Sequence, residues 1–444
     1  MKNLVLPLTL LALAGSPASA QWVLQPFTFT TTPTAFAQQI DIVDAQTVWA
    51  TGLGFRPGSI FAIPRVVRTT DGGTTWTEAT VSIPGSTNES PRNIKGLNAL
   101  TALVCGNSST GWRILKTVDG GATWTKRTTT GQFAHPASYT NFFAMFGATE
   151  GICIGDPIPT TGNRIEMYRT LDAGDTWTAT DTTGVPIALA NEFPIDVFSA
   201  QVGNHFWFHT TKGRAFHSPD KGQTWTVGST GLIYGGNDRN GSIAFRDTLN
   251  GLVRAVTLNA LARTSDGGAT WQRVTTTGPV HRLIAAVPGT SYYLSAGEGT
   301  DAGSSFSTDD GTTWTALETT RSHYDLAALS ATEVWSTAVG FTGNTRTGGL
   351  GFYRAANLLG TPAALPANAL QVYPNPSADG RFALSLAAGL RAESLTVRDA
   401  LGRLVRTQSL NPQEATASLD LTGLRPGVYS VRVGGESRWL VIAE

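Results

Sequence analysis

The stretch Thr69-Thr70-Asp71-Gly72-Gly73-Thr74-Thr75-Trp76 occurs six times in this chain with small changes. Every copy keeps the pattern Ser/Thr-x-Asp-x-Gly-x-Thr-Trp, and successive tryptophans lie 43 to 53 residues apart. A repeat of this length is typical of stacked copies of one supersecondary unit. The repeat therefore predicts the fold, but it names no ligand. The six tryptophans are Trp76, Trp124, Trp177, Trp225, Trp271 and Trp314.

Each copy has the residues of a hairpin turn. An alternating run such as Arg113-Ile114-Leu115-Lys116 leads in, Asp accepts hydrogen bonds from the backbone ahead of it, and Gly adopts a positive φ without strain. The tryptophan then opens the outgoing strand as a large apolar wedge. We therefore expect a structural role for the six aspartates, Asp71, Asp119, Asp172, Asp220, Asp266 and Asp309.

The phrase resembles the Asp box, or BNR repeat, of sialidases and other β-propellers. In that family the box joins the two outer strands of a blade, on the rim and away from the central channel. A calcium site is the alternative, but it needs several oxygen ligands and a distal acidic residue, and each box offers one or two. The sequence therefore predicts no metal and no other cofactor.

The composition favours an all-β chain without a strong electrostatic field. Glycine occurs 49 times, only 14% of residues are charged, and long helical periodicity is missing. Lys and Arg number 32, as do Asp and Glu, which argues against a nucleic-acid partner. Residues 1–20 have the charged start, apolar run and small-x-small end of a signal peptide, and no stretch is long enough to span a membrane.

The strands around the boxes predict seven blades. An apolar strand pair precedes each box, and a seventh pair, 326–338, follows the last box with a third strand at 350–354 but no outer tryptophan strand. The N-terminal run Gln21-Trp22-Val23-Leu24-Gln25 matches the segments that follow the boxes. We therefore expect a seven-bladed propeller over residues 21–355, whose N-terminal strand closes the last blade and so removes open edges.

Two cysteines, Cys105 and Cys153, occupy matching places in consecutive units. Export would permit a disulfide. Equivalent strands of neighbouring blades should, however, hold the two Cα atoms beyond the bridging limit of about 7 Å. We expect two buried free thiols that act as small apolar residues.

A second domain is predicted at the C-terminus. Residues 356–369 read as a linker, and 370–444 contain short alternating strands separated by turn dipeptides, which predicts a small β-sandwich. The segment keeps Tyr373-Pro374-Asn375-Pro376, an Asp-x-x-Gly-Arg hairpin and Gly-x-x-Pro-Gly-Val-Tyr. In these motifs it resembles the type A C-terminal sorting domain of the type IX secretion system. The resemblance implies a partner in that machinery and a place at the surface of, or outside, a Gram-negative cell.

Polar residues at one mouth of the channel are the candidate binding residues. In propellers, the loops entering each innermost strand and the loops joining the second and third strands meet there, and loops on a rigid scaffold often bind ligands. From these loops we predict a site made of Arg92, Asp156, Glu192, Arg239, His281, Glu298 and His323, although any one of them taken alone is better interpreted as a solvated loop residue. Other members of the two loop sets are Arg56, Asn107, His135, Lys212, Asp238, Arg282, Asp301 and Tyr324.

The turn Gly155-Asp156-Pro157 resembles one in secreted Asp-box propellers related to the photosystem II stability and assembly factor, a group that the chain resembles across all seven blades. Asp156 could lie at the channel mouth, but a capping role in its own turn is the better interpretation.

A glycoside hydrolase is the alternative function. Such enzymes need two carboxyl groups about 5 to 9.5 Å apart, and Asp156, Glu192, Glu298 and Asp325 are the candidates. Sialidases also need an arginine cluster and a tyrosine nucleophile. The nearest match to their Phe/Tyr-Arg-Ile-Pro motif is Phe61-Ala62-Ile63-Pro64, in which alanine replaces the arginine. Serine-elbow, zinc-helix and phosphate-loop motifs are also missing. We therefore expect a monomeric, non-catalytic protein that binds a protein or a glycan.

Overall fold

The computed structural model describes residues 21–30, 35–56, 59–84, 89–108, 111–233, 241–342, 345–356, 370–386, 394–399, 404–411, 414, 416–433 and 436–443. These residues form two compact units, one from β1 to β28 and one from β29 to β35. The proposed signal peptide, 1–20, and most of the proposed linker, 356–369, lie outside the described residues. No described helix is long and apolar enough to cross a bilayer.

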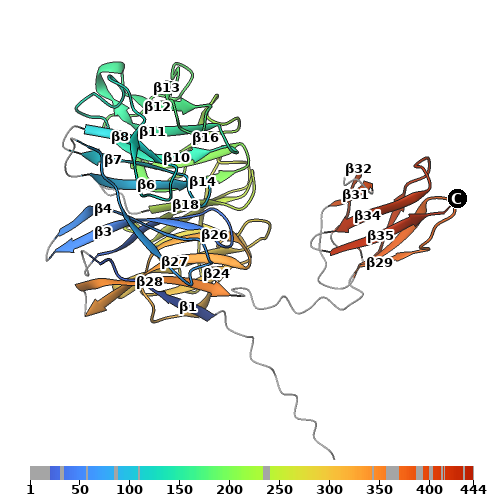
Figure 1. Ribbon diagram of the computed structural model, residues 1–444. Helices are drawn as coiled ribbons and strands as arrows, with labels where there is room; N and C mark the ends of the chain where they lie inside the picture. The colour runs from blue at the N-terminus through green and yellow to red at the C-terminus, as the bar shows by residue number, and fades with distance from the viewer. Residues whose placement is uncertain are drawn as a thin grey trace, which may run out of the picture. The chain divides into compact units, whose positions relative to one another are not determined.

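Seven four-stranded antiparallel sheets make up the first unit as described, and they are arranged as the blades of a propeller (Figure 1). Six blades follow chain order from the innermost strand outward. They are β2 (Phe36–Ile42), β3 (Val48–Arg56), β4 (Ser59–Thr69) and β5 (Thr77–Thr80); β6 (Ser90–Gly96), β7 (Ala102–Ser108), β8 (Gly111–Thr117) and β9 (Thr125–Lys126); β10 (Thr140–Met145), β11 (Gly151–Ile158), β12 (Arg164–Thr170) and β13 (Thr178–Ala179); β14 (Pro194–Val202), β15 (His205–Thr210), β16 (Arg214–Ser218) and β17 (Thr226–Ser229); β18 (Gly241–Phe245), β19 (Gly251–Ala255), β20 (Ala260–Thr264) and β21 (Gln272–Val274); and β22 (Leu283–Ala286), β23 (Tyr293–Gly297), β24 (Gly303–Ser307) and β25 (Thr315–Glu318). Short 3-10 turns at Pro159–Thr161 and Gly299–Asp301 lie between second and third strands.

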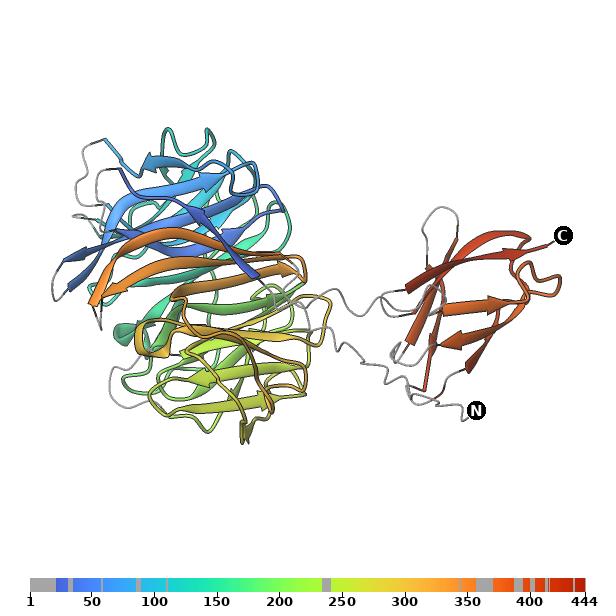
Figure 2. The same ribbon diagram turned by 90° about the horizontal axis from the view of Figure 1, so that it is seen from below.

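The seventh blade joins the two ends of the propeller. It consists of β26 (His323–Ser330), β27 (Glu333–Thr342), β28 (Thr345–Ala356) and, outermost, β1 (Gln21–Pro26). Trp22 pairs with Ala355 in the antiparallel ladder, and the first and last strands lie side by side in Figure 2. Trp22 is 2% exposed, and its Nε1 donates to Ser304 Oγ of the sixth blade at 2.9 Å. The predicted closure of the ring by the N-terminal strand is therefore confirmed.

Each repeated phrase forms the same turn between the third and fourth strands. In the first copy, Asp71 Oδ1 accepts from the Thr69 hydroxyl at 2.8 Å and from Thr75 N at 2.9 Å, while Thr69 Oγ1 accepts from Gly73 N. Hydrogen bonds from Thr75 lower the pKa of Asp71 to about 2. Both carboxylate oxygens are thus used within the turn, since Oδ2 accepts from the Thr75 hydroxyl. The same set recurs at Asp119, Asp172, Asp220, Asp266 and Asp309.

The innermost strands carry a repeated irregularity at their first few residues. In β2, β6 and β10 the pairing with the second strand skips one residue, respectively Gln38, Arg92 and Asn141. Strand β26 has a similar shift between His323 and Leu326. A bulge of this kind re-aims a side chain and breaks the strict alternation of faces. It occurs at the end of the strand where the predicted site lies.

Side chains of innermost strands accept hydrogen bonds from the backbone of a neighbouring innermost strand. These strands have no neighbour on the channel side, so their N–H groups need other acceptors. Asp325 Oδ2 accepts from Ile40 N at 2.8 Å, and Asp41 Oδ2 accepts from Gly96 N at 2.7 Å. Gln39 Oε1 likewise accepts from Ile94 N at 2.7 Å. Polar residues in the channel wall therefore bond the seventh blade to the first and the first blade to the second.

The two cysteines lie on β7 and β11, the second strands of adjacent blades. Both are unbonded and fully buried, as expected of small core residues. Both belong to one apolar cluster of the core.

The second unit is a small sandwich, as predicted. One sheet contains β29 (Leu370–Tyr373), β30 (Arg381–Leu386) and β33 (Thr416–Asp420), and the other has the order β32 (Leu404–Ser409), β31 (Ser394–Asp399), β34 (Gly427–Val433) and β35 (Glu436–Ile442). Alternate residues of both sheets form one apolar core that includes Leu384, Val397, Val431 and Leu440. Burial of this core allows the short strands to form a stable unit.

Candidate binding site at one mouth of the propeller

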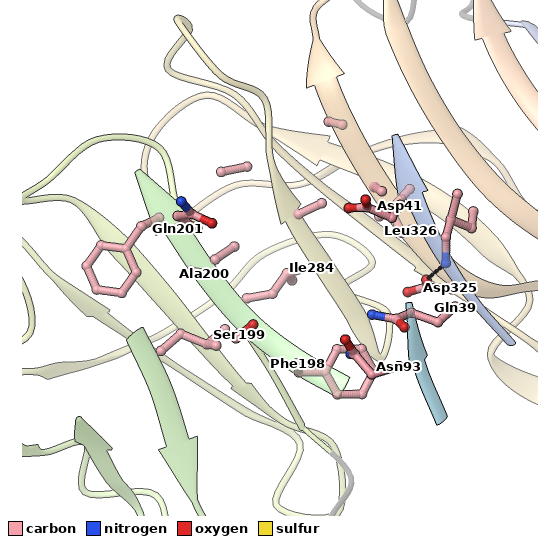
Figure 3. A pocket seen from close by; sticks show the side chains of 18 of the residues that line it. Gln39, Asp41, Asn93, Phe198, Ser199, Ala200, Gln201, Ile284, Asp325 and Leu326 are labelled. Atoms are coloured by element: carbon pink, nitrogen blue, oxygen red, sulfur yellow. Dashed lines mark hydrogen bonds between the residues drawn. The ribbon is translucent and has the colours of Figure 1, made fainter. Parts of the chain in front are cut away.

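The propeller has two chemically different faces. At one face the innermost strands begin and the second strands end, and we call it the inlet face. The third strands end at the opposite face, so the Asp boxes lie there. A channel of about 320 Å³ runs between the innermost strands (Figure 3). Gln39, Asp41 and Asp325 lie on one side of it, and Ala200 and Gln201 on the other.

Asp325 is part of the channel wall. Burial raises the pKa of its carboxyl to about 6, and the hydrogen bond from Ile40 N opposes that shift. The same bond joins the seventh blade to the first. Asp325 is therefore a link between blades rather than half of a pair of carboxyl groups across a cleft.

Two arginines, a glutamate and a tyrosine meet at the inlet face, and we call them the inlet cluster. Glu298 follows β23 and is 8% exposed. Its carboxylate accepts hydrogen bonds from Arg282, which precedes β22, and from Arg346 in β28. The Nε of Arg346 lies 2.9 Å from Glu298 Oε2. The guanidinium groups of Arg282 and Arg346 lie 5.0 and 5.3 Å from the ring centre of Tyr324. The hydrogen bonds to Glu298 raise the pKa of Arg346, and burial raises that of Tyr324.

Aromatic side chains complete the cluster. The Arg346 guanidinium also lies 5.9 Å from the ring centres of Phe36 and Phe341, and Phe36 packs against Tyr324 at 4.7 Å. Cations over aromatic faces are attracted by the ring quadrupole and are held in place by it. The two arginine side chains remain 22 to 24% exposed, so a rigid, polar surface with aromatic neighbours faces the solvent here.

The other predicted site residues are spread around the inlet face or turned inward. Glu192 is 2% exposed and paired with Arg214, and Asp156 accepts from Asn141 Nδ2 on the neighbouring strand at 2.9 Å. His281 contacts Asp301. Arg92 is the extra residue of its bulge, and its Nε has no hydrogen-bond partner among the residues described. Arg239 and Asp238 lie outside the described residues, as do the side chain of Arg56 and those of Phe61 and Ala62.

His323 belongs to the core. It is fully buried, its ring lies 4.9 Å from that of Trp22, and its nitrogens contact Ser336 Oγ and Glu318 Oε1. Burial lowers the pKa of His323, so the ring is neutral in this setting. We therefore assign it to the closure of the ring and leave it out of the candidate site.

Sequence reasoning missed Arg346, Phe36 and Phe341. Arg346 lies at the start of β28, next to the connection between the second and third strands of the seventh blade, which is equivalent to the loops that supplied Glu298 and Asp156. Applying the same loop rule to that blade could have found it. The two phenylalanines look like ordinary core residues in the sequence, and only the structure places them beside the arginines.

Comparison with known proteins identifies the C-terminal unit. Residues 371–442 match the model of the secretion system C-terminal sorting domain. The chain is thus a propeller protein that carries the sorting signal for export by the type IX secretion system. No curated protein matches the sequence.

Solved propellers share the fold of the first unit. YCF48 from Cyanidioschyzon merolae is 15% identical, with 76% of this chain and 99% of that chain covered and a TM-score of 0.51. A structure of YCF48 bound to a D1 peptide has 15% identity, coverages of 77% and 99%, and a TM-score of 0.47. The α-L-arabinofuranosidase Arb93A from Fusarium graminearum has 12% identity, coverages of 77% and 98%, and a TM-score of 0.41. Similarity at these identities concerns the fold alone.

Proposed function

We propose that the exported protein binds a protein or a glycan at its inlet face and catalyses no reaction there. The observation that carries the proposal is that each of the four candidate carboxyl groups already has a partner within the protein. Glu298 is bound by two arginines, Glu192 by Arg214, Asp156 by Asn141, and Asp325 by the backbone of the next blade. A general acid or nucleophile needs a carboxyl group that faces the substrate, and a carboxylate paired in this way is poorly suited to proton transfer.

The inlet cluster supports binding in a positive way. Arg282 and Arg346 are fixed by Glu298 and by the rings beside them, so little side-chain entropy is lost when a ligand contacts them. Arginine and aromatic residues are also the types enriched at binding hot spots. The site is built on strand ends rather than on long loops, which favours a preformed surface.

One observation favours the alternative, a glycoside hydrolase. The guanidinium groups of two arginines lie 5.0 and 5.3 Å from the ring centre of Tyr324, and both arginines bind Glu298; these are the residue types that sialidase chemistry uses. Burial raises the pKa of Tyr324, however, and that change makes the hydroxyl a weaker nucleophile at neutral pH.

Binding and hydrolysis can be separated with the full mature chain. We expect binding on a polysaccharide array, or co-purification of a surface partner, without turnover of fluorogenic glycosides. Arg282→Ala should weaken the interaction at least tenfold. Arg354→Ala, which removes an ion-paired arginine of similar exposure (30% against 24%) beside an Asp box, should leave the interaction unchanged. Turnover that Glu298→Gln abolishes would establish the hydrolase instead.

Export gives a second test. Deleting residues 370–444 removes the sorting domain and leaves the propeller strands intact, so we expect the truncated protein to stay in the periplasm. Immunoblots of periplasm, cell surface and medium measure the distribution, and a folded truncation recovered outside the cell in normal amounts would show that another signal directs export.

A further inference from the structure

The two sheets of the sorting domain turn chemically different faces outward. The four-stranded sheet, with the order β32-β31-β34-β35, packs one face on the core of the sandwich and turns the other away from it (Figure 1). We call the second of these the outer face. Residues that pair directly across an antiparallel ladder lie on the same face of a sheet. One row across the outer face therefore contains Leu404, Arg398, Ser430 and Trp439.

Large apolar side chains are exposed on the outer face. Trp439 is 66% exposed and Leu404 is 54% exposed, at opposite ends of the row. Val428, which is 47% exposed, lies two residues from Ser430 along β34. Leu440, the neighbour of Trp439, is fully buried in the core, so the alternation of the strand directs the indole outward. Exposed apolar groups gathered on one face are typical of a protein–protein contact.

Basic side chains lie among these apolar groups. Arg398 belongs to the row itself, and Arg432 belongs to the next row, opposite Thr396 and Ser437. Both arginines are exposed. None of the outward residues that the structure describes in these four strands is acidic. Tryptophan and arginine are also the residue types enriched at the hot spots of protein interfaces.

The outward face of the three-stranded sheet offers less to a partner. Arg381 pairs with Asp420 across two of its strands, so the two charges oppose each other. Ala383 and Ser418 face each other in the same ladder. Among the described residues of this sheet, Tyr373 is the one large apolar side chain that is exposed. The outer face is therefore the better candidate for a contact surface.

The Tyr-Pro-Asn-Pro motif holds the strand that carries Trp439. Asn375 Nδ2 donates to the carbonyl oxygen of Trp439 at 2.7 Å, and the backbone N of Val441 donates to Asn375 Oδ1 at 2.8 Å. The backbone N of Ser377 donates to the carbonyl oxygen of Val441. The edge of β35 is thus already paired, so a partner has no free edge for strand addition on this side. Side chains of the outer face are left to make the contact.

We propose that the export machinery recognises this protein through the outer face of the sorting domain, and that it meets this face with an apolar pocket bordered by acidic side chains. The pocket receives the indole of Trp439, and the carboxylates pair with Arg398 and Arg432. The match to the sorting-domain family indicates that the machinery handles this unit. Recognition of this kind presupposes export through the sorting domain and is independent of the ligand of the propeller.

Export of the full chain tests the role of Trp439. We expect Trp439→Ala to lower the fraction recovered at the cell surface and in the medium about tenfold, because truncating a buried interface tryptophan costs much of the binding energy. Trp439→Phe should retain most of the export. Leu171→Ala changes a residue of the propeller that is 64% exposed, and export should stay normal. An unchanged thermal midpoint of the purified Trp439→Ala chain shows that the loss of export is not a loss of folding.

Charge reversal tests the chemistry of the partner and does not depend on the tryptophan variant. Arg432→Glu should reduce export more than Arg432→Ala, and Arg432→Lys should largely retain it, because acidic side chains of the partner would repel the new carboxylate. Arg381→Glu makes the same reversal on the other sheet, where the side chain is 67% exposed, and export should stay normal. Equal effects of Arg432→Glu and Arg381→Glu would contradict an acidic partner at the outer face.

Deletion of residues 370–444 distinguishes two kinds of failure. If the deletion traps the protein in the periplasm while Trp439→Ala and Arg432→Glu are exported normally, the domain directs export through another surface and the outer face is the wrong assignment. If the deleted chain is itself exported normally, export does not depend on the sorting domain, and the outer face has no part in it.

Discussion

Replacing Trp22 with alanine is expected to lower the free energy of unfolding by about 3–5 kcal/mol. The indole is 2% exposed, lies against the rings of His323 and Tyr353, and donates to Ser304 Oγ in the sixth blade. Its removal leaves a cavity at the seam where the ring closes, and the Ser304 hydroxyl keeps only its bond to Glu318. Urea unfolding followed by far-ultraviolet circular dichroism measures the loss.

The same strand supplies a matched control. Val23 is 46% exposed, so Val23→Ala should change the free energy of unfolding by less than about 0.5 kcal/mol. If Trp22→Ala falls within 1 kcal/mol of Val23→Ala, β1 does not close the ring in solution in the way described. A large effect of Trp22 alone would show that the first strand of the propeller determines the stability of the whole propeller.

The blades could be predicted from sequence because the box is a local structure. The carboxylate of Asp71, like its equivalents in the other boxes, forms hydrogen bonds to groups no more than four residues away. The geometry of the turn therefore follows from the eight residues of the box alone. Ring closure was also predictable, since Gln21–Pro26 looks like the segments that follow the boxes. The two kinds of segment share their residue types and their alternation of side chains. These features can be recognised even though the N-terminal strand lies far along the chain from the rest of its blade.

The candidate site was only partly predictable, because one residue of register decides which way a side chain points. Arg282, Glu298 and Tyr324 were named from the correct loops and do meet. Glu192 and His323 come from the same kind of loop, yet both turn into the protein. The bulges at the start of the innermost strands shift the alternation at this place, and their positions cannot be read without the pairing of the strands.

The second large effect is expected at Glu192. Its carboxylate accepts from Arg214 Nε at 2.9 Å, from Leu189 N at 2.6 Å and from the Thr210 hydroxyl. Arg214 is 18% exposed and also lies 5.0 Å from the ring centre of Phe216. Glu192→Ala leaves this arginine and the other donors without their acceptor, so we expect a loss of about 3–5 kcal/mol in the free energy of unfolding.

A double-mutant cycle separates a structural role from a catalytic one. The pair Glu192→Ala and Arg214→Ala should cost clearly less together than the sum of the single changes, since each single change strands the other partner. A catalytic Glu192 would behave differently: Glu192→Gln would abolish turnover of a substrate with little change in stability. Additive effects, or a loss below 1 kcal/mol, would remove the argument that Glu192 belongs to the scaffold. Because this glutamate is one of the four carboxyl groups open to a hydrolase, its result bears directly on whether the propeller binds or cleaves.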